Sequence, residues 1–115
     1  MVKREVVGAH YGLRDWIAQR VTAVIMVAYT VVILSTVIGL PAMDYWQWLV
    51  LWQTPLVQYA TVLFVVSLLI HAWVGVRNIF MDYIKDPALR LTLYVLVIAA
   101  LLWYGVWSVQ LLWSL

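Results

Sequence analysis

Three long stretches of this chain contain no Asp, Glu, Lys or Arg, and they constrain its fold more than any other feature. They run from Val21 to Met43, from Tyr45 to Val76 and from Leu91 to Leu115. A helix needs about 20 predominantly apolar residues to cross a bilayer, so each stretch is long enough to span one. Because 67% of the 115 residues are hydrophobic and only 10% are charged, we expect lipid to surround most of the chain.

Proline and capping residues divide the chain into helices. We predict an all-α fold, a bundle of three transmembrane helices in one domain over residues 1–115. The helices are expected at about 16–39, 55–80 and 87–113. Asp15 is the expected cap of the first helix. Thr54-Pro55 and Asp86-Pro87 each put a capping residue before a proline, which is favoured at the first helical position.

The connection between the first two predicted spans contains a short segment rich in tryptophan, at about 44–52. It includes Trp46, Trp48 and Trp52. Trp is enriched at the depth of the lipid headgroups, so we expect a short helix lying at the membrane surface.

The basic residues all fall at one end of the predicted bundle. They are Lys3, Arg4, Arg14, Arg20, Arg77, Lys85 and Arg90. The opposite connection and the C-terminal tail have none, so the positive-inside rule predicts a cytoplasmic N-terminus and a periplasmic C-terminus. The N-terminal segment lacks the Arg- and Ser-rich, acid-poor composition of a mitochondrial transit peptide, which favours a bacterial inner membrane.

The chain contains no Cys and two His, which are His10 and His71. The lack of Cys excludes disulfides, thiolate metal sites and covalent haem attachment through this chain. Only His71 lies within an apolar span, so a haem with two histidine ligands would need its second ligand from another chain. Partner subunits are expected for this reason.

His71 belongs to a polar stripe on the second predicted span. The stripe follows helical spacing and comprises Ser67, His71, Gly75, Asn78 and Asp82. The residues alone leave two interpretations open. In one, the stripe packs on neighbouring helices, and its small residues allow close approach. In the other, His71 is a haem ligand or a proton relay, because ionisable groups inside membranes usually have a function.

Arg20 lies at the mouth of the first predicted span. A guanidinium there would suit a haem propionate. Arginines at helix ends also reach lipid phosphates, and from the residues alone we favour this second interpretation.

Three sequence segments give the chain a resemblance to a known family. The chain resembles the hydrophobic membrane anchor subunits of bacterial succinate dehydrogenases in Ser67-Leu-Leu-Ile-His71-Ala-Trp-Val-Gly75 and the following Asp82-Tyr83-Ile-Lys85. It is also similar to that family in Gly12-Leu-Arg-Asp-Trp16-Ile-Ala-Gln-Arg20-Val-Thr-Ala23. The length and the three-helix plan agree over nearly the whole chain.

The resemblance implies roles for individual residues. His71 would be an axial ligand of the iron of haem b, opposite a histidine of a companion anchor. Tyr83 would hydrogen-bond ubiquinone, and Arg20 matches a position near a haem propionate. Asp82 would either support the proton supply of the quinone site or make a structural interaction at the helix end. Some relatives carry histidine where this chain has Arg14, so Arg14 is assigned no role.

The resemblance also implies a four-subunit succinate:quinone oxidoreductase. In it, a flavoprotein carrying FAD oxidises succinate, an iron–sulfur subunit passes electrons to ubiquinone, and two anchors hold haem b in the lipid bilayer. This chain would anchor the complex without acting on succinate itself, in electron transport linked to the tricarboxylic acid cycle. No nucleic-acid partner is expected.

Two alternatives stay open. A fumarate reductase-type anchor has the same architecture. A small transporter subunit is less well supported, because the charges gather at one rim instead of in mid-membrane.

Overall fold

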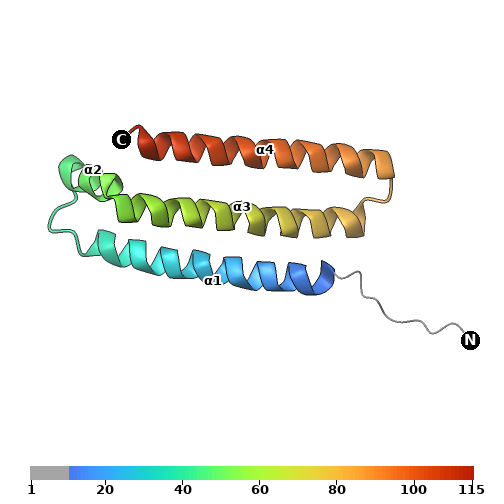
Figure 1. Ribbon diagram of the computed structural model, residues 1–115, viewed down its shortest axis with the longest axis horizontal. Helices are drawn as coiled ribbons and strands as arrows, with labels where there is room; N and C mark the ends of the chain where they lie inside the picture. Colours follow the sequence, from blue (N-terminus) through green and yellow to red (C-terminus); the bar gives the residue numbers. More distant parts are fainter. Residues whose placement is uncertain (1–10) are drawn as a thin grey trace, which may run out of the picture.

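The computed structural model describes the backbone of residues 11–115 and the side chains of residues 12–115. It contains α1 (Tyr11–Ile38), α2 (Tyr45–Gln53), α3 (Pro55–Tyr83) and α4 (Pro87–Trp113), and no strand over this range (Figure 1). α1, α3 and α4 are each long and apolar enough to cross a membrane. The prediction of an all-α fold with three helices able to span a bilayer is therefore confirmed.

The first helix begins earlier than predicted. α1 starts at Tyr11, so Asp15 lies in its second turn and does not cap it. The expectation of a cap at Asp15 was wrong, because this carboxylate makes an ion pair with Arg77 of α3 instead. A carboxylate with a charged partner across a helix interface gains a charge-assisted hydrogen bond that a cap within its own helix would not provide.

Thr54 also differs from its expected role. It precedes α3 at the N-cap position but makes no side-chain cap hydrogen bond. Its hydroxyl donates to the carbonyl of Val50, one turn back in α2, at 2.8 Å. Thr54 therefore ties the end of α2 to the start of α3, and Pro55 begins α3 without a side-chain cap.

The two aspartates at the other helix starts do cap. Asp44 accepts a hydrogen bond from the backbone N–H of Gln47 at 2.8 Å, at the start of α2. Asp86 accepts one from the N–H of Ala88 at 3.2 Å, at the start of α4. These caps satisfy amides that have no partner within their own helix.

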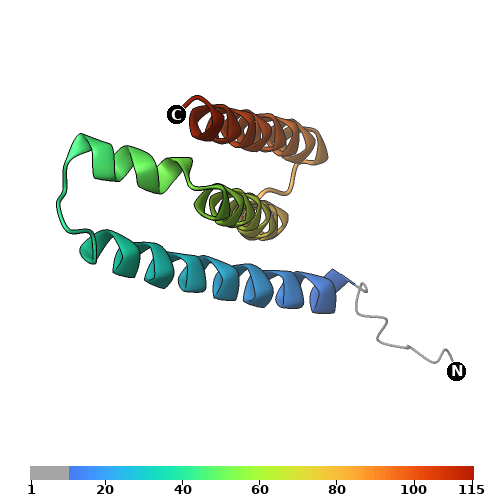
Figure 2. The same ribbon diagram turned by 60° about the vertical axis from the view of Figure 1, so that its left-hand side comes forward.

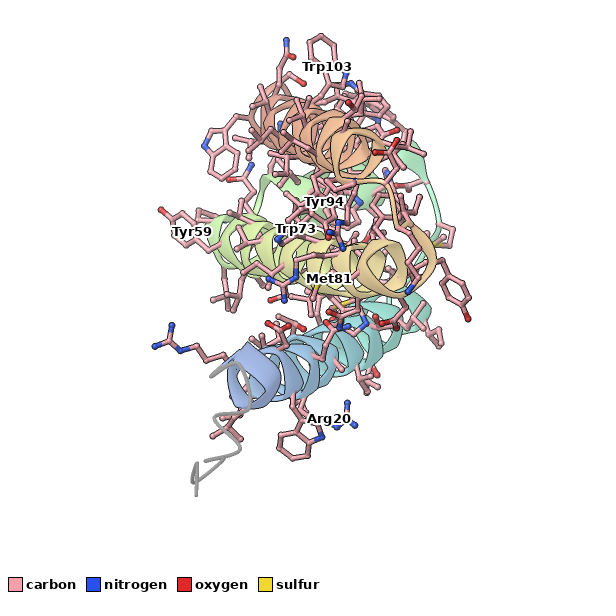
Figure 3. The ribbon with its side chains drawn as sticks, turned by 90° about the vertical axis from the view of Figure 1, so that its right-hand side faces the viewer. Arg20, Tyr59, Trp73, Met81, Tyr94 and Trp103 are labelled. Carbon is pink, nitrogen blue, oxygen red and sulfur yellow. The ribbon has the colours of Figure 1, made fainter. Side chains whose placement is uncertain are left out.

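The three long helices lie in a row with α3 in the middle. α3 packs on α1 on one side and on α4 on the other, while α1 and α4 do not contact each other in the described part of the chain (Figures 1 and 3). α2 crosses from the end of α1 to the start of α3 and packs on α3 and α4 (Figure 2). A row encloses less than a closed bundle, and five of the described residues are buried: Thr22, Leu51, Ser67, Val74 and Leu112.

The connectivity gathers charge at one end of the row. The start of α1, the end of α3 and the start of α4 lie together, and we call this the basic end (Figure 1). Its described basic residues are Arg14, Arg20, Arg77, Lys85 and Arg90. α2 and the C-terminus lie at the opposite end (Figure 1).

Polar side chains join α1 to α3 at both ends of their contact. Near the basic end, the ion pair of Asp15 and Arg77 is 23% and 26% exposed, respectively. Further along, the Tyr29 hydroxyl lies 2.7 Å from the Thr61 hydroxyl, and the Tyr29 ring stacks on Phe64 with centroids 4.5 Å apart. The contacts advance along α1 as they recede along α3, so they define an antiparallel register.

The contact between α3 and α4 is mainly aromatic and apolar. Trp73 meets the edge of Tyr94 with ring centroids 5.6 Å apart, and Phe80 stacks on Tyr94 at 6.0 Å. Figure 3 shows Trp73 and Tyr94 in the space between these two helices. At the opposite end, the Gln58 side-chain amide donates to the carbonyl of Leu112 at 3.2 Å.

We predict that Asp15 and Arg77 are energetically coupled. Asp15→Asn or Arg77→Gln should each leave a partly buried charge without its partner, and the double substitution should destabilise less than the two single ones together. We expect a coupling free energy of about 1 to 3 kcal/mol. Thermal unfolding of the purified protein in detergent, measured for all four combinations, gives this value.

Arg14→Gln is the matched control, because Arg14 is exposed and adjacent to Asp15 in sequence, and neighbours in sequence do not face each other on a helix. If Arg77→Gln lowers stability no more than Arg14→Gln does, the ion pair does not hold α1 on α3.

Candidate functional site

His71 lies near the middle of the long α3 helix, half-buried at its contact with α1. Its Nδ1 is 3.1 Å from the hydroxyl oxygen of Thr22, which comes from α1 and is only 5% exposed. The same hydroxyl is 2.6 Å from the carbonyl oxygen of Ala18, one turn back in α1. The imidazole is thus held by its neighbour helix through one ring nitrogen.

The other ring nitrogen of His71 is uncommitted. Among the described residues, the hydrogen bonds of this side chain involve Nδ1 alone. An imidazole nitrogen with a lone pair is a common metal ligand, and a histidine that binds metal usually has its second nitrogen in a hydrogen bond. The arrangement of His71 therefore suits ligation through Nε2.

The rest of the predicted polar stripe continues along α3. Ser67 is 3% exposed, and Asp82 is exposed in the last turn of the helix. Gly75 faces Gln19 of α1, because a Cβ built on it would lie 3.6 Å from the Gln19 side-chain nitrogen. The stripe therefore packs on α1 along part of its length. His71 takes part in this packing through Nδ1, while its Nε2 has no partner among the described residues.

A pocket of about 440 Å³ opens between α1 and α3 at the basic end. Its lining residues are Gly12, Asp15, Trp16, Gln19, Arg20, Asn78 and Met81. Near it, Gln19 Oε1 and Arg77 Nε are buried and have no hydrogen-bond partner among the described residues. Buried polar atoms are nearly always paired. Gln19 Oε1 can therefore accept one further hydrogen bond here, and Arg77 Nε can donate one.

Arg20 lies at the outer rim of this pocket. Its guanidinium carbon is 5.0 Å from the centre of the Trp16 ring, in cation–π geometry. Arg20 and Thr22 are two positions apart, and at about 100° per residue they face nearly opposite sides of α1. Figure 3 shows Arg20 directed away from α3. Within this chain, Arg20 and His71 are not brought together.

Tyr83 and Asp82 end α3 at the basic end. Tyr83 is 80% exposed, and neither residue lines the pocket of Arg20. The twelve residue steps from His71 to Tyr83 correspond to about 18 Å along the helix axis. This chain therefore offers two separate positions on one helix, an imidazole in its middle and a phenol at its end.

The described residues contain no group of three or more His, Cys, Asp or Glu side chains that could hold a metal ion. His10 lies outside the described residues. His71 is consequently a single candidate ligand, and the described part of the chain supplies no second one beside it.

The structure adds residues that the sequence analysis did not single out. Thr22 contacts His71, and Gln19 lines the polar pocket beside Asp15, which the sequence analysis had considered only as a helix cap. A signal for them was present in the sequence, because positions 15, 19, 22 and 29 follow the spacing of one face of a helix that continues from the N-terminal side into the first apolar span. The polar residues of α1 thus mirror the stripe of α3.

The comparisons with known proteins agree with this architecture. The model of the family described as succinate dehydrogenase/fumarate reductase transmembrane subunit matches residues 2–107, a range that includes α1, α3 and His71. A succinate dehydrogenase hydrophobic membrane anchor subunit from Coxiella burnetii (strain RSA 493 / Nine Mile phase I) is 36% identical over 102 residues, which is 89% of each chain. With its three helices able to span a bilayer, this chain belongs to the family of succinate dehydrogenase and fumarate reductase transmembrane subunits.

Proposed function

We propose that this chain is the hydrophobic membrane anchor subunit of a bacterial succinate dehydrogenase, which holds haem b together with a companion anchor and contributes to the ubiquinone-reduction site. The observation that carries the proposal is the state of His71: Nδ1 is held by Thr22, and Nε2 is without a partner among the described residues. This imidazole lies within an apolar helix of a chain that belongs to an anchor family.

The residues present fit half of a haem site. His71 would hold the haem iron from this chain, and a companion anchor would supply the second ligand. Because α1, α3 and α4 form a row instead of a closed bundle, their faces are open to a flat group shared with a second subunit. When bound, haem would supply reversible one-electron chemistry. Arg20 could pair with a propionate if its side chain left the Trp16 ring.

Tyr83 is the proposed contact to ubiquinone. A phenol donates a hydrogen bond to a carbonyl without carrying a charge at neutral pH. Tyr83 is 80% exposed, so its hydroxyl is accessible to a ligand. The remaining walls of a quinone site would come from partner subunits. Asp82 is exposed beside it and makes no ion pair with the described residues, which favours a supporting role at the quinone site over a structural one.

An anchor subunit of this family implies catalytic subunits at the membrane, and we propose the ones that the sequence resemblance implies. A flavoprotein with FAD and an iron–sulfur subunit would dock on the basic end, where Tyr83 lies, so that electrons reach the quinone without crossing the bilayer. This end would face the cytoplasm of a bacterial cell, and the chain would sit in the inner membrane. Succinate chemistry would belong to the flavoprotein.

A fumarate reductase anchor is the second candidate, because the family description names both enzymes. The name of the Coxiella burnetii relative favours succinate dehydrogenase. Comparing the succinate oxidation and fumarate reduction rates of the purified complex, with ubiquinone and menaquinone analogues, distinguishes the two.

The haem assignment predicts that His71→Ala abolishes or alters the low-spin haem b spectrum of the purified complex. Alanine favours helix and is apolar, so the chain should still insert and assemble. A reduced-minus-oxidised spectrum and the haem content per complex measure the effect. His10→Ala, which changes the other histidine, is the control and should leave the spectrum as it is. An unchanged haem spectrum in the His71 variant would contradict the assignment of His71 as a haem ligand.

The quinone assignment predicts that Tyr83→Phe slows quinone reduction. The substitution deletes only the hydroxyl, and an unpaired quinone carbonyl should cost about 1 to 3 kcal/mol, or roughly five- to more than a hundredfold in quinone-dependent turnover. Succinate oxidation with a soluble dye should be unchanged. Tyr59→Phe is the matched control, because Tyr59 is 66% exposed near the other end of α3. Wild-type turnover by the Tyr83 variant at all quinone concentrations contradicts the role.

The orientation predicts opposite accessibility of two single cysteines. The chain has no cysteine of its own, so Lys85→Cys and Leu115→Cys each introduce a unique thiol. In intact cells, a maleimide that does not cross the inner membrane should label position 115 from the periplasm, and position 85 only after lysis. Labelling of position 85 in intact cells would reverse the proposed topology.

A further inference from the structure

We propose that Thr22 is a positioning residue that sets the tautomer of His71, so that Nδ1 carries the proton and Nε2 presents its lone pair to iron. The inference rests on the proposed haem ligation by His71. It assigns a function to a residue of α1 that binds neither haem nor quinone.

The argument starts from the single proton of the Thr22 hydroxyl. Three acceptors lie within its reach: the Ala18 carbonyl oxygen at 2.6 Å, His71 Nδ1 at 3.1 Å and the Gln19 carbonyl oxygen at 3.3 Å. Two oxygen atoms 2.6 Å apart repel each other unless a proton lies between them, since this is the length of a strong O–H···O hydrogen bond. The hydroxyl therefore donates to Ala18.

Other hydroxyls of this chain behave in the same way. Seven further Ser and Thr side chains donate to the carbonyl four residues earlier: Thr30, Ser35, Thr36, Thr54, Thr61, Thr92 and Ser108. At Thr61 the same hydroxyl lies 2.7 Å from Tyr29, so Tyr29 must be the donor across the helix interface. Thr22 has the same geometry, with His71 in place of the tyrosine.

A hydroxyl that has given its proton to Ala18 can only accept from His71. Nδ1 must then carry the hydrogen, and in a neutral imidazole this leaves Nε2 unprotonated. Thr22 is 5% exposed, which leaves little room for water to replace its hydroxyl. The tautomer of His71 is therefore determined by α1, although His71 itself belongs to α3.

The surrounding contacts keep Thr22 opposite His71. The ion pair of Asp15 and Arg77 lies on one side of this contact along the two helices, and the hydrogen bond of Tyr29 with Thr61 lies on the other. A slip of either helix by one turn would break both flanking contacts. The register thus holds the hydroxyl at the imidazole.

Electronic consequences follow from the hydrogen bond. An imidazole whose second nitrogen donates to an acceptor is a more basic ligand, and its ring orientation is restrained. A more basic ligand stabilises the ferric state relative to the ferrous state. Removing the acceptor should therefore raise the midpoint potential of the haem and loosen its binding.

Thr22→Val tests this in the purified complex with all its subunits. Valine keeps the branched shape and loses the hydroxyl. A redox titration should show a haem potential higher than that of the wild type, and the low-spin ferric EPR signal should shift. Haem transfer to apomyoglobin should be faster, by about 10- to 100-fold if the effect resembles that of other lost partners of metal-bound histidines.

Two variants control for packing. Thr22→Ser restores the hydroxyl and should restore the potential and the EPR signal. Thr30→Val removes a hydroxyl from the same helix that donates to Met26 at 2.7 Å, and it should leave both readouts unchanged. If Thr22→Val does not assemble, Thr22→Cys takes its place. A thiol is a weaker acceptor, so the potential should rise above the wild-type value.

The outcomes separate this inference from the proposed function. An unchanged potential in Thr22→Val, or in Thr22→Cys if valine does not assemble, overturns the role of Thr22. An equal shift in Thr22→Val and Thr22→Ser overturns it too, because packing instead of the hydroxyl would be the cause. If His71→Ala retains the wild-type haem spectrum, the proposed function fails, whatever the Thr22 variants show.

Discussion

The antiparallel register of α1 against α3 is the constraint on which the rest of this structure depends. Within a bilayer, apolar contact specifies a register poorly, because lipid tails are as apolar as the side chains they would replace. Polar contacts between helices therefore carry most of the specificity. Three of them join α1 to α3, namely Asp15 with Arg77, Thr22 with His71, and Tyr29 with Thr61. A fourth, from Gln58 to the Leu112 carbonyl, joins α3 to α4. The register of α1 on α3 is therefore specified at three levels along the two helices.

α3 is central both in the row and in the proposed function. It contacts α1 and α4 while these do not contact each other in the described part of the chain, and it carries both His71 and Tyr83. About 18 Å of helix joins the two residues, so one rigid element sets the distance between the proposed haem ligand and the proposed quinone contact. The exposed apolar surfaces of the row suit a protein that is completed by partner subunits and lipid.

The sequence predicted the elements well and some of their ends poorly. Three helices able to span a bilayer follow from apolar length, which is a local property. The cap expected at Asp15 was wrong, because its carboxylate pairs with Arg77. Thr54 does occupy the N-cap position of α3, as expected, but its hydroxyl donates to the Val50 carbonyl and makes no cap hydrogen bond. Asp86 does cap, as expected, since no described residue competes for its carboxylate. The capping preference of a residue therefore predicts its hydrogen bond correctly where no group of another helix competes for its side chain.

Hydropathy and residue spacing alone show that the chain is helical, that its three long helices can cross a membrane, that its basic residues gather at one end, and that His71 is the single histidine within a span. Only the tertiary structure decided that α3 lies between α1 and α4, that Asp15 pairs with Arg77, and that Thr22 meets Nδ1 of His71. The physical reason is that hydropathy and spacing act along one helix. Which polar atoms of two helices meet depends on the register and rotation of the pair, and these are settled only when the helices pack.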